Sequence, residues 1–126
     1  IDNYSKVNQC KYIECCLKET LRLYPSVPHL DRELVKDIEI TVNNQKHKLR
    51  KGDELIICTR AIGRLPWIWK DCNKFIPERF MNKSYHQHKY PAFNINPRSC
   101  LGKNVALLEG IIAIIKIFTN FNELNA

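Results

Sequence analysis

Apolar residues recur at helical spacing close to both ends of this chain. The pattern predicts a helix over residues 7–24, which Pro25 ends because a proline ring cannot continue a helix. It predicts a second long helix over residues 101–118, where Glu109 and Lys116 argue against a membrane span. The residues expected on the buried side of this second helix are Val105, Leu108, Ile111, Ile112, Ile115 and Phe118.

Between the two helices the pattern changes to that of short strands. Residues 37–42 alternate apolar and polar side chains, which predicts a half-buried strand, and an Asn-Asn turn leads into a return strand over residues 45–49. The apolar run 54–58 predicts a short buried strand, and residues 61–65 a brief helix. Together these elements indicate an α+β fold that is mainly helical.

Two charged residues stand out on the first predicted helix. Glu19 and Arg22 are three positions apart and therefore share one helix face. Further along, residues 67–80 read Trp-Ile-Trp-Lys-Asp-Cys-Asn-Lys-Phe-Ile-Pro-Glu-Arg-Phe. Their composition predicts an irregular aromatic loop that packs on a core.

The sharpest chemical signal is Cys100, at the end of the polar loop Phe-Asn-Ile-Asn-Pro-Arg-Ser-Cys-Leu-Gly, residues 93–102. A thiolate is a nucleophile and a metal ligand, and it is favoured near cationic groups and helix N-termini. Arg98 lies two residues before the sulfur, and the final helix follows it. The alternative is a structural cysteine buried at the junction of loop and helix.

This loop resembles the Phe-x-x-Gly-x-Arg-x-Cys-x-Gly signature of the cytochrome P450 family. Phe93, Arg98, Cys100 and Gly102 match it, and Asn96 replaces the first glycine, a change that positive φ would tolerate. The resemblance implies that Cys100 is the axial thiolate ligand of a haem iron and that Arg98 binds a haem propionate. It also implies that Phe93 shields the sulfur and that Gly102 allows a close approach to the porphyrin.

Two further segments resemble motifs of the same family, in the same order along the chain. They are Glu-x-x-Arg around Glu19 and Arg22, and Pro-Glu-Arg-Phe, which contains Arg79. The resemblance implies that these three side chains form a buried structural lock. It also places residues 26–30 beside the haem, where His29 would meet a propionate or the substrate, unless it is simply an exposed loop histidine.

The family resemblance implies that residues 1–126 are the C-terminal fragment of one haem-thiolate monooxygenase domain, incomplete without the oxygen-activating helix. We therefore expect the isolated chain to fold poorly and to bind haem weakly or not at all. The full enzyme would insert one oxygen atom of O2 into a small lipophilic substrate, with long-chain fatty-acid ω-hydroxylation as the closest branch. The implied partner is a redox protein such as NADPH-cytochrome P450 reductase. The implied location is the cytosolic face of the endoplasmic reticulum membrane, with attachment through a segment preceding this chain.

Two other functions are compatible with the same sequence. One is a haem-thiolate isomerase or lyase, which uses the same iron and cysteine on peroxides. The other is a non-catalytic remnant or a basic binding module, since the formal net charge is +7 and the pI about 9.2. The lysines and arginines are scattered rather than grouped, so we expect a solvated surface and no nucleic-acid partner. The 6 cysteines show no Cys-x-x-Cys spacing, which favours reduced thiols over a disulfide framework.

Overall fold

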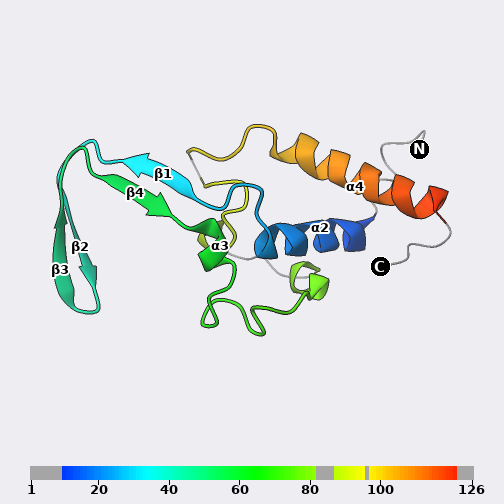
Figure 1. The fold of residues 1–126 in the computed structure, drawn as a ribbon, viewed down its shortest axis with the longest axis horizontal. Coiled ribbons are helices and arrows are strands. Elements are labelled where there is room, and N and C mark those ends of the chain that lie inside the picture. Colours follow the sequence, from blue (N-terminus) through cyan, green and yellow to red (C-terminus); the bar gives the residue numbers. More distant parts are fainter. Residues whose placement is uncertain (1–9, 82–86, 96, 122–126) are drawn as a thin grey trace.

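The computed structural model describes residues 10–81, 87–95 and 97–121. It confirms a mainly helical α+β fold, in which α2 and α4 lie side by side and the strands extend away from them (Figure 1). The elements are α2 (Lys11–Leu23), β1 (Leu30–Glu33), β2 (Ile38–Val42), β3 (Gln45–Leu49), β4 (Glu54–Ile57), α3 (Thr59–Ile62), η1 (Pro77–Phe80), η2 (Gln87–Lys89) and α4 (Lys103–Asn120). Helix α2 ends two residues before Pro25, as predicted.

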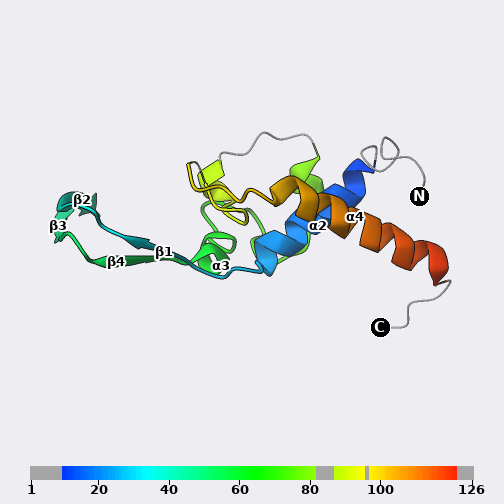
Figure 2. The same ribbon diagram turned by 90° about the horizontal axis from the view of Figure 1, so that it is seen from above.

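The strands form two separate antiparallel pairs, β1 with β4 and β2 with β3. In the β2–β3 hairpin Ile38 pairs with Leu49, and the turn residues Asn43 and Asn44 have φ values of 50° and 62°. Two successive left-handed residues are typical of the turn that matches the twist of a hairpin. The β1–β4 ladder leads from α3 to this hairpin, which lies at the end farthest from α4 (Figure 2). Strand β1 was not predicted, because Leu30–Glu33 contains a single apolar residue.

Several burial predictions were wrong. The strand expected to be buried, β4, alternates exposed and partly buried residues, with Ile56 71% exposed. The strand expected to be half-buried, β2, is mostly exposed. Among the described elements, β2 and β4 make substantial contacts with their strand partners β3 and β1 and not with a helix or a second sheet, so their faces stay largely uncovered. On α4, Ile111 is buried, three of the expected residues are partly buried, and Val105 and Phe118 are exposed. The brief helix also begins earlier than expected, at Thr59.

The irregular segment 67–80 packs on a core, as predicted, through two of its aromatic residues. Trp69, Phe80 and Tyr90 are buried together with Cys15 of α2. The ring centroids of Trp69 and Phe80 are 6.0 Å apart, and Phe80 meets Tyr90 edge to face at 5.2 Å. This contact geometry adds to the stabilisation from burial itself. The irregular segment that carries Trp69 and Phe80 is therefore packed against α2.

The final helix does not have the composition of a membrane span. Within residues 10–81, 87–95 and 97–121, no helix combines the length and the apolar character that crossing a membrane requires.

Two glycines allow segments to approach α2 closely. A Cβ at Gly63 would overlap the backbone carbonyl of Arg22, and a Cβ at Gly110 of α4 would lie 2.6 Å from Cδ2 of Leu17. Gly63 has right-handed helical φ and ψ, so the close contact and not its conformation requires glycine. A backbone carbonyl cannot move aside, whereas the end of a leucine side chain can rotate.

We therefore predict that Gly63→Ala destabilises the complete protein by about 1–3 kcal/mol, because overpacked sites force the backbone to shift. Gly110→Ala is the matched control and should cost less, since Leu17 can yield and alanine is the better helix former. The measurement is the free energy of unfolding in urea for both variants. Equal stability of the two variants would contradict the packing that we describe around Gly63.

Candidate functional site

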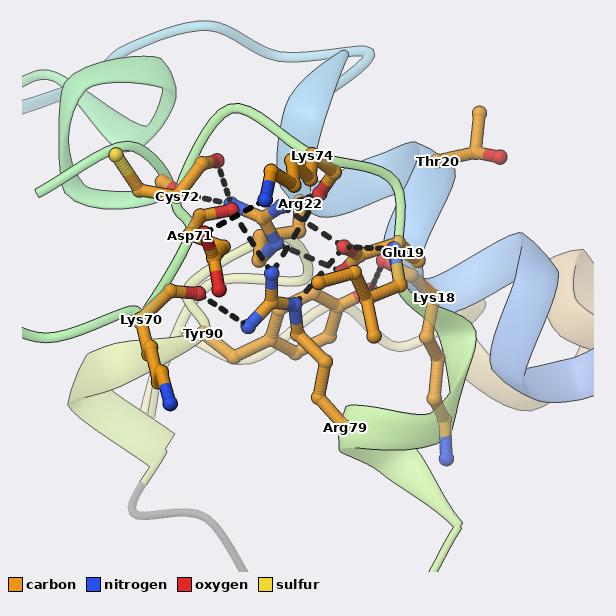
Figure 3. A network of polar contacts seen from close by, with 12 residues as sticks. Lys18, Glu19, Thr20, Arg22, Lys70, Asp71, Cys72, Lys74, Arg79 and Tyr90 are labelled. Atoms are coloured by element: carbon orange, nitrogen blue, oxygen red, sulfur yellow. Dashed lines mark hydrogen bonds and ion pairs between the residues drawn. The ribbon is translucent and has the colours of Figure 1, made fainter. Parts of the chain in front are cut away.

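A buried ion pair lies at the centre of the described structure. The side chains of Glu19 and Arg22 on α2 are both fully buried. Arg22 donates from Nε to Oε2 of Glu19 at 2.7 Å and from Nη2 to Oε1 at 2.8 Å (Figure 3). Two parallel hydrogen bonds of this kind are the strongest form of an arginine–carboxylate contact.

Arg79 of η1 joins the same carboxylate. Its Nε donates to Oε1 of Glu19 at 2.9 Å, and the backbone N–H of Ile76 donates to the same oxygen at 2.9 Å. The structure thus brings together the three side chains that the family resemblance grouped as a lock. We call Glu19, Arg22 and Arg79 the Glu–Arg–Arg cluster.

The two arginines also bind the irregular segment that follows α3. Arg22 donates from Nη1 to the carbonyls of Gly63 and Cys72, the latter at 2.7 Å, and from Nη2 to that of Lys74 at 3.1 Å. The Nη1 group of Arg79 donates to the carbonyl of Lys70 at 2.7 Å. Buried backbone carbonyls need partners, and this segment has no regular ladder to supply them. No pattern in the sequence points to these acceptors, because every residue has a backbone carbonyl.

The cluster determines the ionisation of its carboxylate. Burial alone would raise the pKa of Glu19, but the hydrogen bonds from Arg22, Ile76 N–H and Arg79 outweigh it. The net pKa of Glu19 is therefore lowered. Hydrogen bonding to the charged form and two nearby cations both act in this direction.

The cysteine loop, residues 93–102, precedes α4, and the structure describes its residues 93–95 and 97–102. The backbone N–H of Cys100 donates to the carbonyl of Phe93 at 2.8 Å, and that of Arg98 to the carbonyl of Ile95 at 2.9 Å. Helix α4 begins at Lys103 with Gly102 as its N-cap. Cys100 is thus one turn ahead of the positive end of the helix dipole.

Cys100 is exposed, which does not match the alternative of a buried structural cysteine. The buried thiol is instead Cys15 on α2, and burial raises the pKa values of Cys15 and its neighbour Cys16. A Cβ added at Gly102 would meet Sγ of Cys100 at 4.0 Å and no other atom within that distance. The side of the loop that carries the sulfur is therefore open.

The other predicted site residues differ in their exposure. Phe93 is half-buried, with Nζ of Lys103 6.0 Å from its ring centroid, and Arg98 is exposed. His29 is exposed immediately before β1. Asn96, which replaces the loop glycine, lies outside the described residues. Within these, the left-handed residue of the loop is Asn94, with φ of 62°.

Sequence reasoning missed a contact between β1 and the cysteine loop. Nη2 of Arg32 donates to Oδ1 of Asn94 at 2.7 Å. The two residues are 62 positions apart, and β1 itself was not predicted, so nothing in the pattern pointed to this pair.

Comparison with known proteins identifies the family. The family model described as "Cytochrome P450" matches residues 2–124. The chain belongs to the cytochrome P450 family. Three similar relatives are probable cytochrome P450 4aa1 of Drosophila melanogaster, cytochrome P450 4V2 of Rattus norvegicus and cytochrome P450 3A5 of Homo sapiens. They are 38%, 37% and 35% identical over 82%, 82% and 94% of this chain, respectively.

This cytochrome P450 chain spans about a fifth of the length of these relatives, between 19% and 23%. Another relative, cytochrome P450 86B1 of Arabidopsis thaliana, is 40% identical over 82% of the chain. The percentage identity to this chain is thus similar for relatives whose names place them in different numbered groups. The family is assigned by these matches, and the branch within the family is not.

The change in the free energy of unfolding at acidic pH tests the Glu–Arg–Arg cluster. The pKa of Glu19 is lower in the folded than in the unfolded state. The ionised carboxylate therefore contributes its full share to the free energy of unfolding above the unfolded pKa of about 4.3, and this share is lost as the pH falls below that value. We predict that Glu19→Gln costs about 3–5 kcal/mol near neutral pH, because it leaves two guanidinium groups without a counter-charge. Below pH 5, the free energy of unfolding of Glu19→Gln should also fall less steeply with decreasing pH than that of the wild type. The measurement is urea unfolding of the complete protein across this pH range.

Glu14→Gln on the same helix is the control for this prediction. Glu14 pairs with Lys18 on a partly exposed face of α2, so its replacement should cost about 0–1 kcal/mol and leave the loss of stability at acidic pH unchanged. A similar loss in the two variants would show that the cluster is not the source of the effect.

Proposed function

We propose that this chain forms the thiolate-bearing side of the haem site of a monooxygenase, which inserts one oxygen atom of O2 into an organic substrate. The observation that carries the proposal is Cys100. Its side chain is exposed at the end of a hydrogen-bonded loop, directly before α4, in a chain that belongs to the cytochrome P450 family.

The residues of the loop fit a haem better than a metal ion held by protein ligands alone. A porphyrin supplies four nitrogen ligands, so one cysteine is a sufficient protein ligand. Among the described residues, no group of three or more His, Cys, Asp and Glu side chains is placed to hold a metal ion. The open side of Gly102 also leaves room for a flat group beside the sulfur.

When bound, a haem with a thiolate ligand supplies the activation of O2 and the cleavage of its O–O bond. The chain's own residues hold and tune that group. In our proposal Cys100 is the iron ligand, and the exposed guanidinium of Arg98 binds a propionate. Phe93 keeps water from the sulfur, which affects how strongly the thiolate donates.

The finer assignment is hydroxylation of a long-chain fatty acid. It is supported by the resemblance of residues 93–103, 61–64 and 68–69 to the ω-hydroxylase branch. We further propose that electrons come from NADPH-cytochrome P450 reductase, with the exposed Lys103 at the start of α4 as a cation for an acidic partner surface. The complete protein would act at the endoplasmic reticulum membrane.

The reduced carbon monoxide difference spectrum of the complete protein tests the haem ligand. We expect the strongly red-shifted Soret band of a thiolate-ligated haem, and we expect Cys100→Ala to abolish it, because no other ligand replaces the sulfur. Cys58→Ser is the matched control, since Cys58 is also an exposed cysteine but lies at the end of β4, outside the loop.

A band typical of histidine-ligated haem in the wild type would contradict the proposal and favour a degenerate remnant. A thiolate band without substrate oxidation, but with turnover of peroxides in the absence of a redox partner, would favour the isomerase or lyase alternative.

A substitution at Gly102 can distinguish a role in haem binding from a role in folding. We predict that Gly102→Ala costs the haem-free protein only about 1 kcal/mol, the loss expected for alanine at the N-cap of α4, because an added Cβ meets no atom of the described chain closer than 4.0 Å. The same variant should bind clearly less haem, since its methyl group would occupy the open side of the loop. The measurements are urea unfolding without haem and haem content after reconstitution. Unchanged haem content would contradict this role.

A further inference from the structure

Thr59, the first residue of α3, is a polar residue that the described structure buries, with 3% of its surface exposed. It lies outside the Glu–Arg–Arg cluster, which contains the buried Glu19 and Arg22. A buried hydroxyl needs a hydrogen-bond partner, and that of Thr59 donates to the carbonyl of Val27 at 2.6 Å. The acceptor lies 32 positions earlier in the chain, so the hydroxyl joins α3 to the connection between α2 and β1 (Figure 2).

The start of α3 holds two successive carbonyls of this connection. The β1–β4 ladder ends at Leu30, and Pro28 has no N–H with which to extend it. The carbonyl of Pro28 instead accepts the backbone N–H of Arg60 at 3.2 Å, next to the bond between Thr59 and Val27. Of these two bonds only the second depends on a side chain, so it alone can be removed by substitution.

The connection presents its side chains outward, beside the chain that enters the cysteine loop. The side chains of residues 26–29 are exposed, and Val27 is 52% exposed. Pro25 and Thr59 line a small cavity together with Pro91 and Ala92, which directly precede the loop. The backbone of the connection is thus fixed, while an apolar side chain next to the loop is left uncovered by the described chain.

We propose that Thr59 is a positioning residue for the substrate, because its hydroxyl fixes the backbone at Val27 and so places the Val27 side chain against an apolar part of the substrate. The inference rests on the proposed function, in which a haem and a substrate lie beside this part of the chain. Thr59 itself contacts neither of them in this proposal. A valine held in one position offers a defined apolar surface, which suits an alkyl group.

Three variants of the complete protein separate the hydroxyl from the rest of the residue. Thr59→Val keeps the branched shape and removes the hydrogen-bond donor, and Thr59→Ser keeps the donor. Thr20→Val is the matched control. The hydroxyl of Thr20 also donates to a backbone carbonyl, that of Cys16 at 2.9 Å, but it is exposed and lies within α2.

The first readout is the binding of two alkyl isocyanides to the reduced haem. Methyl isocyanide and n-butyl isocyanide bind iron through the same carbon atom, so the ratio of their dissociation constants reports on the surroundings of the alkyl group. We expect Thr59→Val to lower the preference for n-butyl isocyanide about fivefold, a size typical of losing one neutral hydrogen bond. Thr59→Ser and Thr20→Val should keep the wild-type ratio. An unchanged ratio in Thr59→Val would overturn the inference.

A double-mutant cycle tests whether Thr59 acts through Val27. Val27→Ala shortens an exposed side chain and keeps the carbonyl that accepts the hydroxyl, so the fold should tolerate it. We expect Val27→Ala alone to lower the isocyanide ratio, and we expect Thr59→Val to have little further effect in that background. Equal effects of Thr59→Val in both backgrounds would refute the role of Val27, and an unchanged ratio in Val27→Ala would do the same.

A second readout does not depend on the haem. The backbone N–H of Arg60 donates to the carbonyl next to that of Val27, so its hydrogen exchange in the haem-free complete protein reports on the anchoring of the connection. We expect Thr59→Val, but not Thr20→Val, to accelerate this exchange about fivefold. Unchanged exchange would contradict the anchoring.

Failure of the inference can be distinguished from failure of the proposed function. A wild type without the thiolate band in its carbon monoxide spectrum would refute the proposed function and leave Thr59 no substrate to position. A thiolate band in the wild type, together with faster Arg60 exchange but an unchanged isocyanide ratio in Thr59→Val, would refute only the inference. Thr59 would then support the fold without positioning a substrate.

Discussion

A buried carboxylate that accepts hydrogen bonds from two arginines is the constraint on which the described structure depends. Glu19 and Arg22 are fully buried, and ions without partners there would cost several kcal/mol each. The requirement to satisfy these charges brings Arg79 and the backbone carbonyls of residues 70–74 to α2. An irregular segment without helix or strand hydrogen bonds thereby acquires one conformation.

The effect of the Glu–Arg–Arg cluster extends to the cysteine loop through the aromatic core. The ring of Trp69 lies 5.3 Å from the guanidinium carbon of Arg22 and also packs on Phe80, which in turn contacts Tyr90. The hydroxyl of Tyr90 donates to the carbonyl of Lys18 on α2 at 3.1 Å. Tyr90 lies three residues before Phe93, so the loop is anchored at its start to the helix that carries the cluster.

The sequence predicted the parts of this arrangement that depend on local pattern or on a family motif. Pro25 marked the end of α2, two asparagines marked the hairpin turn, and the Glu–Arg–Arg cluster followed from the resemblance. It did not predict β1, because a strand with one apolar residue has no periodicity to detect. It overestimated the burial of α4 and β4, because periodicity indicates which face of an element is apolar and not whether anything covers that face. Contacts such as Arg32 with Asn94 depend on how distant elements meet and have no local signature.

The cysteine loop therefore has two supports of different kinds. At its start Tyr90 links it to α2 through buried aromatic packing, and at its bend Asn94 links it to β1 through a polar contact. The two supports resist different motions, because packing limits translation of the segment, whereas a directed hydrogen bond limits rotation of a peptide plane. A ligand atom needs both, since the distance and the direction of its lone pair both decide how it binds a metal. The backbone N–H of Cys100 is thus held by the carbonyl of Phe93 while its side chain stays exposed, which leaves one side open for the group that it would bind.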